Sequence, residues 1–346
     1  MNLKPSPTHT SRSGGCTLTG ALSVTTQVRD TASIIHGPRG CAHHNFSLFH
    51  ATLLENEQAA LPDLVSSSLG ESDIIFGGED ALARSVRSVC ERDVAAVFVL
   101  STCIVATIGD DVDAVCSRDW PVPVIPVPTA GFLGGSFQDG VNNALIALAD
   151  RAEPSPVCPC VNIVGEKNLE YEVEENYAEV VRLLTLLGLP VGIRFVRQCS
   201  PDDIPELGAA QLNILRDPSL VPVGDHLRKR FGTPYIPSFP TGLSDTLAFI
   251  SAVAAACRVD VKRAIEIERA LQAEVLADFA DISDAQGVFC GPVTDPESSR
   301  AAREAAEALH IRIGVNGSAH PLPVHPVIGT SGVRRMLHRW RRKIHA

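Results

Sequence analysis

Short apolar runs alternate with amphipathic stretches along most of the chain. Residues 94–103, VAAVFVLSTC, are almost continuously apolar, as expected of a parallel strand buried on both faces. Residues 72–93 predict a short strand, a Gly-Gly turn and a helix with apolar residues at positions i, i+3 and i+4. Residues 108–119 predict the start of a helix with acidic residues in its first turn, and residues 122–132 a strand and a turn. This βαβα order favours an α/β fold with a doubly wound parallel sheet.

The alternation continues after a proline-rich break at residues 151–160. We predict tandem Rossmann-like domains with doubly wound parallel sheets, the last one abbreviated because its segment holds too few elements for a full domain. The predicted boundaries are a flexible lead-in at 1–15, a first Rossmann-like domain at 16–154, a second at 155–260 and a third α/β unit at 261–346.

Composition narrows the class of protein. The 346 residues are 45% hydrophobic and 20% charged, which suits a globular chain with sizeable cores. The net charge of −10 argues against a nucleic-acid partner, which basic residues would have to neutralise. No apolar run reaches the roughly 18 residues of a membrane span, and the first residues lack the apolar core of a secretory signal. We therefore expect a cytoplasmic protein without a membrane partner.

Basic residues crowd the C-terminus, against the overall acidic balance. They fit a solvated helix end, where positive charge is favourable against the helix dipole, or a docking patch for an acidic partner. The residues are Arg334, Arg335, Arg339, Arg341, Arg342 and Lys343.

The chain has ten cysteines, and without a secretion signal we expect them to be reduced. Such a count favours metal or redox chemistry, although a free cysteine also behaves as a small buried hydrophobe. Cys158 and Cys160 form a C-P-C sequence, which is too short for the usual C-x₂-C metal knuckle.

Three other cysteines have a placement in common. Cys41 and Cys103 each follow a predicted strand, and ligands of open α/β sheets collect at the carboxyl ends of the strands. Cys16 precedes an apolar helical pattern. Each thiol adjoins the start of a helix, where backbone N–H groups favour the thiolate. Three thiolates converging on one sheet edge suit an iron–sulfur cluster.

Three ligands do not complete a cubane cluster, which takes four. The fourth ligand must come from a partner chain, a non-cysteine side chain or solvent, and two chains together would offer six thiolates. We therefore expect the cluster, [4Fe-4S] or larger, at a subunit interface. The alternative is a small-molecule binder without a cluster, in which all of the cysteines pack in the interior.

The sequence resembles the nitrogenase component 1 superfamily. The resemblance rests on CTLTGAL and IIHGPRGCA, in which Cys16 and Cys41 are 25 positions apart, and on STCIVATIGDDVDAVC followed by PVIPVPTAGFLGG. It continues through FGGEDAL, VNIVGEKN, AQLNI, RKRFGTPYI and HPVIGTSGVRRML. In motif the chain is most similar to cofactor-scaffold and β-type subunits. In length it is similar to the small nickel-tetrapyrrole reductive cyclase.

The resemblance implies Rossmann-like domains, a homodimer or a heterodimer with a paralogous component 1 subunit, and an iron–sulfur cluster between subunits. It also implies an ATP-dependent [4Fe-4S] reductase as electron donor. By motif the metal ligands would be Cys16, Cys41 and Cys103. Gly37 and Gly40 would allow close approach of the backbone to the cluster.

The chain also departs from the nitrogenase pattern. The stretch AAQLNILRD lacks the cofactor-binding cysteine of nitrogenase α-subunits. His320 and His325 lie near the region of the cofactor-binding histidine, but they also fit a polar loop. Dinitrogen reduction by this chain is therefore not expected.

Two functions follow from these observations. The main hypothesis is an oxidoreductase subunit whose interface cluster takes electrons from the reductase and reduces an organic substrate such as a tetrapyrrole. The alternative is a non-catalytic scaffold or partner subunit for iron–sulfur or metal-cofactor assembly. The candidate catalytic groups near the cluster are His36, His43, His44 and Asp110, each of which also has a structural interpretation.

Overall fold

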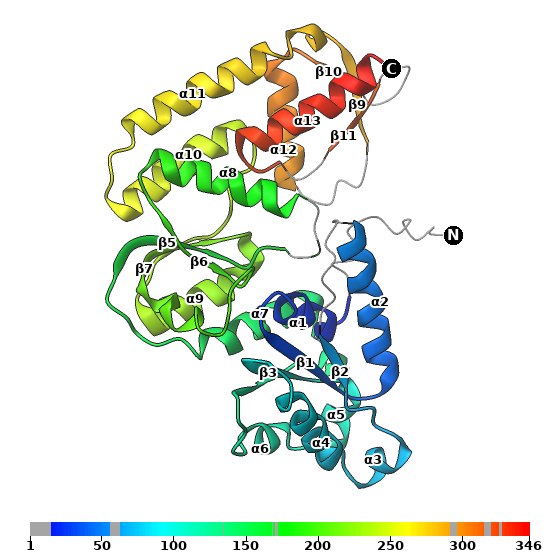
Figure 1. Cartoon of the computed structure of the whole chain (residues 1–346). Coiled ribbons are helices and arrows are strands. Elements are labelled where there is room, and N and C mark those ends of the chain that lie inside the picture. The colour runs from blue at the N-terminus through cyan, green and yellow to red at the C-terminus, as the bar shows by residue number, and fades with distance from the viewer. Residues whose placement is uncertain are drawn as a thin grey trace. The chain divides into compact units, whose positions relative to one another are not determined.

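The computed structural model describes residues 15–55, 63–133, 135–167, 169, 172–290, 296–314, 320–324 and 327–346. Within these residues the strands form three sheets, and the predicted α/β class with parallel sheets is confirmed (Figure 1). None of the described helices combines the length and the apolar character needed to cross a bilayer.

The first sheet contains the two strands that precede Cys41 and Cys103. Its strand order is β2-β1-β3-β4, formed by Leu64–Ser66, Thr31–His36, Ala96–Ser101 and Val124–Val127. All pairs are parallel, and Thr31 of β1 is in register with Ala96 of β3. The first five residues of β3 are buried, which confirms the prediction of a strand covered on both faces. The carboxyl ends of β1 and β3 therefore lie side by side.

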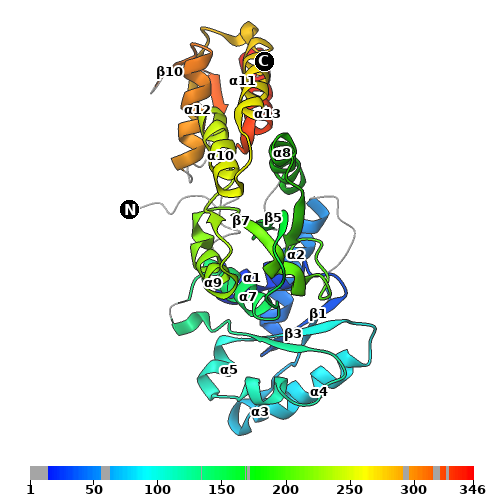
Figure 2. The ribbon, with the colours of Figure 1, turned by 90° about the vertical axis from the view of Figure 1, so that its left-hand side faces the viewer.

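Helices cover both faces of this sheet. α1 (Thr17–Thr25) and α7 (Phe137–Ala149) pack on one face, whereas α4 (Glu79–Cys90) and α6 (Val112–Cys116) pack on the other (Figures 1 and 2). Alternate residues of β3 enter the two cores, as expected of a strand. The remaining elements of this region are α2 (Arg39–Glu55), α3 (Glu71–Phe76), α5 (Cys103–Ile108) and the 3₁₀ turn η2 (Gly131–Leu133).

One prediction in this region is wrong. The apolar run within residues 72–76 predicts a strand, but α3 is a helix. Gly70 caps its start, and the Asp73 carboxylate accepts the Gly70 N–H at 2.9 Å. No residue of α3 is buried, and Ile75 and Phe76 are 72% and 87% exposed. The local cap therefore decides the conformation where no core selects a strand.

Helices α1 and α7 approach each other so closely that glycine is required on both. A Cβ atom on Gly20 would lie 1.9 Å from the Phe137 carbonyl oxygen, and one on Gly140 would lie 1.9 Å from the Thr17 carbonyl oxygen. All nine residues of α1 are buried. This crossing fixes the N-terminus of α1, where Cys16 lies.

We expect Gly140→Ala to destabilise the protein by about 1–3 kcal/mol, because backbone rather than a flexible side chain must move. Urea unfolding followed by circular dichroism measures the loss. Gly40→Ala is the control, because nothing lies within 4 Å of a Cβ atom there. Equal unfolding midpoints for the two variants would contradict the close crossing.

The second sheet has the order β6-β5-β7-β8, formed by Val191–Phe195, Cys158–Val164, Ala210–Leu215 and Tyr235–Ile236. Strands β5, β7 and β8 pair in parallel. One hydrophobic core joins residues of this sheet to α1, α7 and the first sheet. Around it lie α9 (Val221–Phe231) and the 3₁₀ turns η3 (Ile204–Ala209) and η4 (Pro218–Leu220).

The third sheet has the order β10-β9-β11 and belongs to a separate core. Its strands are Arg312–Ile313, Gln286–Cys290 and His320–Pro323. The helices of this region are α8 (Val173–Leu186), α10 (Gly242–Cys257), α11 (Lys262–Ala277), α12 (Pro296–Ala308) and α13 (Gly329–Ile344), with the 3₁₀ turn η5 (Ala280–Ile282).

The described residues form two compact units rather than a simple succession of sheets. One unit contains Glu172–Val191 and the described parts of Ser238–Ala346, so that α8 belongs with the third sheet. The other contains the described parts of Ser11–Tyr171 and Gly192–Pro237, and therefore the first two sheets. We call these the C-terminal unit and the cysteine unit. The domain boundaries predicted from the sequence remain predictions.

The C-terminal unit contains an ion network in which two glutamates are buried and the arginine between them is partly exposed. Arg182 of α8 donates to both oxygens of Glu179 and both oxygens of Glu268, at 2.8–3.0 Å. The two glutamate side chains are 1% and 0% exposed. Glu179 accepts the Ser331 N–H at the start of α13, and Glu268 accepts the Thr330 hydroxyl at 2.5 Å. The network thus joins α8, α11 and α13.

The basic C-terminus is largely occupied by ion pairs within the same unit. Arg334 pairs with Asp278 at 2.8 Å, and Arg335 pairs with Glu172 at 3.2 Å. Arg339 and Arg341 also pair with acidic side chains, those of Glu172 and Asp281 respectively. Intramolecular pairing, rather than solvation alone, therefore accounts for most of this charge.

Candidate functional site

All three predicted ligands lie at helix starts in the cysteine unit. Cys16 is the N-cap of α1, Cys41 lies in the first turn of α2, and Cys103 is the first residue of α5. Cys16 is exposed, whereas Cys41 and Cys103 are half-buried. Burial and then the neighbouring thiols of Cys16 and Cys103 raise the pKa of Cys41. The structure therefore brings the three thiols close to one another at the carboxyl edge of the first sheet.

One detail of the prediction needs correction. The helix after β3 starts at Cys103 itself and ends at Ile108, and Gly109 after it has a left-handed conformation; Asp111 then caps α6. Stabilisation of the thiolates by the helix N-termini remains a prediction.

Buried polar atoms without a partner flank the cysteines. They are the hydroxyl oxygens of Thr17 and Thr102 and the Oδ1 atom of Asn45. Thr17 follows Cys16, Thr102 precedes Cys103, and Asn45 donates to the Cys41 carbonyl oxygen at 2.8 Å. The sequence did not single out these three residues, although two of them adjoin a cysteine. A buried polar atom without a partner is costly, so the region suits a bound group that can accept or donate hydrogen bonds.

The donor set fits a cluster better than a single ion. Among the described residues, no three His, Cys, Asp or Glu side chains are placed to hold one metal ion. In an iron–sulfur cluster each thiolate binds a different iron, so its ligands lie farther apart than those of one ion. Three neighbouring thiols beside unpartnered hydroxyls fit such a cluster.

The two glycines of the HGPRGC turn differ in their surroundings. A Cβ atom on Gly37 would lie 2.2 Å from the Thr102 hydroxyl oxygen, so this glycine allows the turns before Cys41 and Cys103 to touch. At Gly40 no atom lies within 4 Å of a Cβ position. Close approach within the chain therefore accounts for Gly37, and the predicted approach of Gly40 to a cluster remains a prediction.

His36 and Asp110 form a buried pair. The His36 Nε2 atom lies 3.1 Å from the Asp110 Oδ2 atom, and the two side chains are 0% and 3% exposed. Nδ1 lies 2.9 Å from the Ser67 hydroxyl oxygen. Burial lowers the pKa of His36 more than the Asp110 charge raises it, which favours a neutral ring. We infer that Nε2–H donates to Asp110 and that the Ser67 hydroxyl donates to Nδ1.

The other two candidate histidines are exposed. His43 and His44 lie on α2 just after Cys41. On the same helix the rings of Phe46 and His50 stack with centroids 6.0 Å apart. A role of His43 and His44 at the cluster or towards a partner remains a prediction.

Four further cysteines of the cysteine unit are either disulfide-bonded or buried. Cys158 and Cys160 form a disulfide, so the expectation of fully reduced cysteines is wrong for this pair. Their Cα atoms, 5.4 Å apart, lie within the usual range for a disulfide. Burial raises the pKa of Cys116 and of Cys199 to about 12, as expected of inert packing residues.

We expect brief alkylation of the iron-free protein at pH 8 to modify Cys16 first and Cys116 and Cys199 last. Cys16 is exposed, whereas the other two are buried and stay protonated at this pH. Peptide mass spectrometry at increasing times gives the order. Labelling of Cys116 as fast as Cys16 would contradict the structure.

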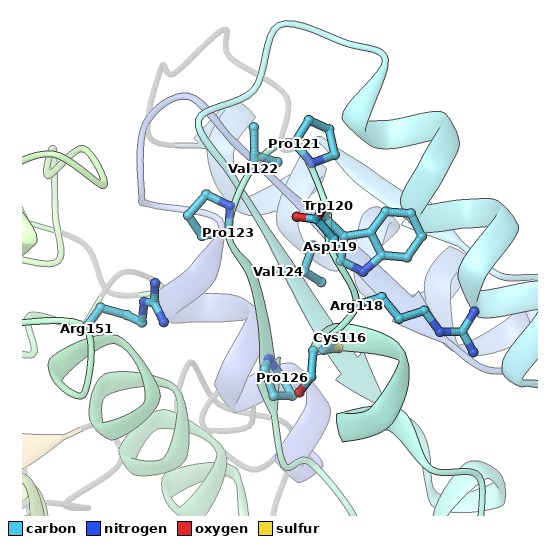
Figure 3. Close-up of a pocket in the computed structure, with 11 residues that line it drawn as sticks. Cys116, Arg118, Asp119, Trp120, Pro121, Val122, Pro123, Val124, Pro126 and Arg151 are labelled. Carbon is cyan, nitrogen blue, oxygen red and sulfur yellow. The ribbon is translucent and has the colours of Figure 1, made fainter.

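A surface hollow of about 520 Å³ is lined by none of the three candidate ligands Cys16, Cys41 and Cys103 (Figure 3). It is lined by the segment from Cys116 to Val124 that leads into β4, together with Pro126 and Arg151. Trp120 of this segment donates its indole N–H to the Val115 carbonyl oxygen at 2.9 Å. Pro126 lies in the edge strand β4, where proline blocks pairing with a further strand. The hollow lies beside the start of β4, and none of the candidate ligands lines it.

One of the two histidines predicted near the cofactor-binding region lies within the described residues. His320 is the first residue of β11 and is half-buried, so it lies in a strand rather than a loop. His325 lies outside the described residues.

Comparison with known proteins identifies a matching family and similar proteins. The family model of nitrogenase component 1 type oxidoreductases matches residues 16–323. The nitrogenase iron-molybdenum cofactor biosynthesis protein NifE of Clostridium pasteurianum is 32% identical over 239 residues, which cover 67% of this chain and 51% of that protein. NifE of Nostoc sp. is 31% identical over 241 residues, covering 67% and 49%. The chain thus spans about half the length of these relatives.

Solved structures share the fold. The structure of nitrogenase Cp1 at pH 6.5 aligns with 100% of this chain and 94% of that chain, with a TM-score of 0.73 and 16% identity. A second, nitrogenase Cp1 at pH 5, aligns with 87% and 63%, with a TM-score of 0.66 and 20% identity. Because the family model covers most of the chain, including all three cysteine segments, the chain belongs to the nitrogenase component 1 type oxidoreductase family.

Proposed function

We propose that this chain is a scaffold or partner subunit that holds an iron–sulfur cluster, or a precursor of a metal cofactor, and passes it on. The observation that carries the proposal is the similarity to NifE proteins, which are named for biosynthesis of the iron-molybdenum cofactor. The matched family range includes the convergent Cys16, Cys41 and Cys103. The main hypothesis from the sequence is an oxidoreductase subunit, and the alternative is a scaffold. The similarity to NifE proteins favours the scaffold.

In this proposal the three thiolates bind the cluster, and a second subunit completes its ligands. Cys16 is exposed and Cys41 and Cys103 are half-buried, so a second subunit could reach a cluster bound there. Phe132 of η2 is 76% exposed, and the adjacent Gly131 packs on Thr17 beside Cys16. An apolar side chain at this position suits burial against a copy of this chain or a paralogous subunit.

Two of the four candidate proton donors are closed to a substrate. His36 and Asp110 are buried and hydrogen-bonded to each other, so neither is open to a substrate. A cluster, when bound, would supply single electrons. A reductase also needs proton donors beside its substrate. Of the four predicted candidates, only His43 and His44 are exposed for that role.

The test is anaerobic purification followed by mixing with an ATP-dependent [4Fe-4S] reductase, ATP and dithionite. A scaffold should contain iron but support no sustained ATP-dependent formation of H₂ or reduction of a tetrapyrrole. Steady turnover of either acceptor would favour the oxidoreductase hypothesis, in which the reductase is the electron donor. Absence of iron after anaerobic reconstitution would exclude both functions.

A further inference from the structure

The helix that carries Cys103 is weakly held by packing. α5 has six residues, Cys103–Ile108, and only Val105 among them is buried. Val105 contributes to a small apolar cluster with Leu69 and Ala81. A helix of this length is not stable alone, so other contacts must fix its position.

Both ends of α5 are tied to one residue, His36. At the start of the helix, the Thr102 N–H donates to the His36 carbonyl oxygen at 3.0 Å. Just after its end, the Asp110 carboxylate pairs with the His36 ring at 3.1 Å. Asp110 is held in turn by the Gly78 N–H, which donates to its Oδ1 atom at 2.9 Å. The main chain and the side chain of His36 therefore fix the two ends of α5.

The same residue begins the turn that leads to Cys41. The next residue, Gly37, donates its N–H to the Ser67 hydroxyl oxygen at 2.9 Å, and its carbonyl oxygen accepts the Leu69 N–H at 3.1 Å. Ser67 also contacts the His36 ring. The turn before Cys41 and the helix that starts at Cys103 are thus both held by the same buried residue, His36.

We propose that His36, with Asp110 and Ser67, is a positioning residue that sets the distance and orientation of Cys103 relative to Cys41. Both ring nitrogens of His36 are occupied within the chain, so the side chain acts through the cysteines rather than on a substrate. The part of the proposal that concerns metal retention rests on the proposed function. The part that concerns thiol geometry does not.

The test compares the wild type with His36→Leu, His36→Gln and His226→Leu. Glutamine can place an N–H near the position of Nε2, whereas leucine removes both hydrogen bonds. His226→Leu is the matched control, because it breaks another His–Asp pair of the cysteine unit, with Asp150 at 2.9 Å. Iron-free proteins are treated with bis(maleimido)ethane, and the Cys41–Cys103 cross-link is quantified by mass spectrometry. Iron-loaded proteins are treated with a chelator, and iron release and the EPR spectrum are followed.

We expect His36→Leu to lower the cross-link yield, to speed iron release by about tenfold and to alter the EPR spectrum. His36→Gln should restore most of the wild-type behaviour, and His226→Leu should change neither readout. A wild-type cross-link yield in His36→Leu would overturn the proposal. If His36→Leu does not fold, Asp110→Asn takes its place, with a smaller change in the same direction. A wild type without iron would count against the proposed function only, since the cross-link still tests the geometry.

Discussion

Replacing Cys103 with alanine is expected to remove most of the iron from the anaerobically purified protein. The reason is that Cys103 lies at the first position of α5, beside Cys41, and supplies one of three thiolates. A cluster with two remaining ligands from this chain is easily lost to solvent or chelators. Iron per chain, measured with the visible absorbance of the same sample, quantifies the loss.

Cys116→Ala is the matched control for this experiment. Cys116 lies in the same unit, but its thiol is buried in the core on the α4 and α6 side of the sheet, with its pKa raised to about 12. We expect this variant to keep its iron while losing some stability to the cavity. Equal iron in Cys103→Ala and the wild type would show that Cys103 is not a ligand.

Replacing Arg182 with methionine is expected to destabilise the C-terminal unit by about 3–5 kcal/mol, the usual cost of leaving a buried charge without its partner. Two carboxylates, Glu179 and Glu268, would stay buried without their shared cation. Arg334→Met is the control, because Arg334 forms an exposed pair with Asp278 at the same 2.8 Å distance. Such surface pairs contribute about 0–1 kcal/mol. Thermal unfolding of both variants gives the comparison.

The pH dependence gives a second readout of the same network. Burial alone would raise the pKa of Glu179, but hydrogen bonds and charge from Arg182, with hydrogen bonds from Ser331, lower it overall. The stabilisation is therefore fully present above the unfolded-state pKa of about 4.3 and is lost as the pH falls through the lower folded-state value. In Arg182→Met burial dominates and raises this pKa, so mild acid should stabilise the variant relative to neutral pH. Parallel pH profiles for the variant and the wild type would contradict this account.

Much of the fold could be predicted because buried parallel strands have a strong pattern. The run at 94–103 predicted β3, and its carboxyl end placed Cys103 on the correct edge. The same apolar pattern hid the boundary between strand and helix, because CIVATI continues it into α5. At α3 the apolar run is exposed, so a local cap rather than a core decided the conformation.

The placement of the three cysteines at one sheet edge could be predicted, whereas the contacts that support them could not; their role as ligands remains a prediction. The positions of Cys16, Cys41 and Cys103 follow from local strand and helix patterns. The partners of His36 do not, because Ser67 and Asp110 are 31 and 74 positions away in the sequence. The unpartnered hydroxyls of Thr17 and Thr102 likewise became visible only once the turns were brought together. Long-range pairing of this kind leaves no periodic signal in one sequence.

The most direct test of the cluster-scaffold account is a joint count of iron and mass on anaerobically purified protein. The account predicts a brown protein with broad visible absorbance, several irons per assembly, and an assembly mass of at least two subunits. That second subunit is either a copy of this chain or a co-purified paralogue. A colourless monomer that takes up no iron after anaerobic reconstitution with iron and sulfide would contradict the account.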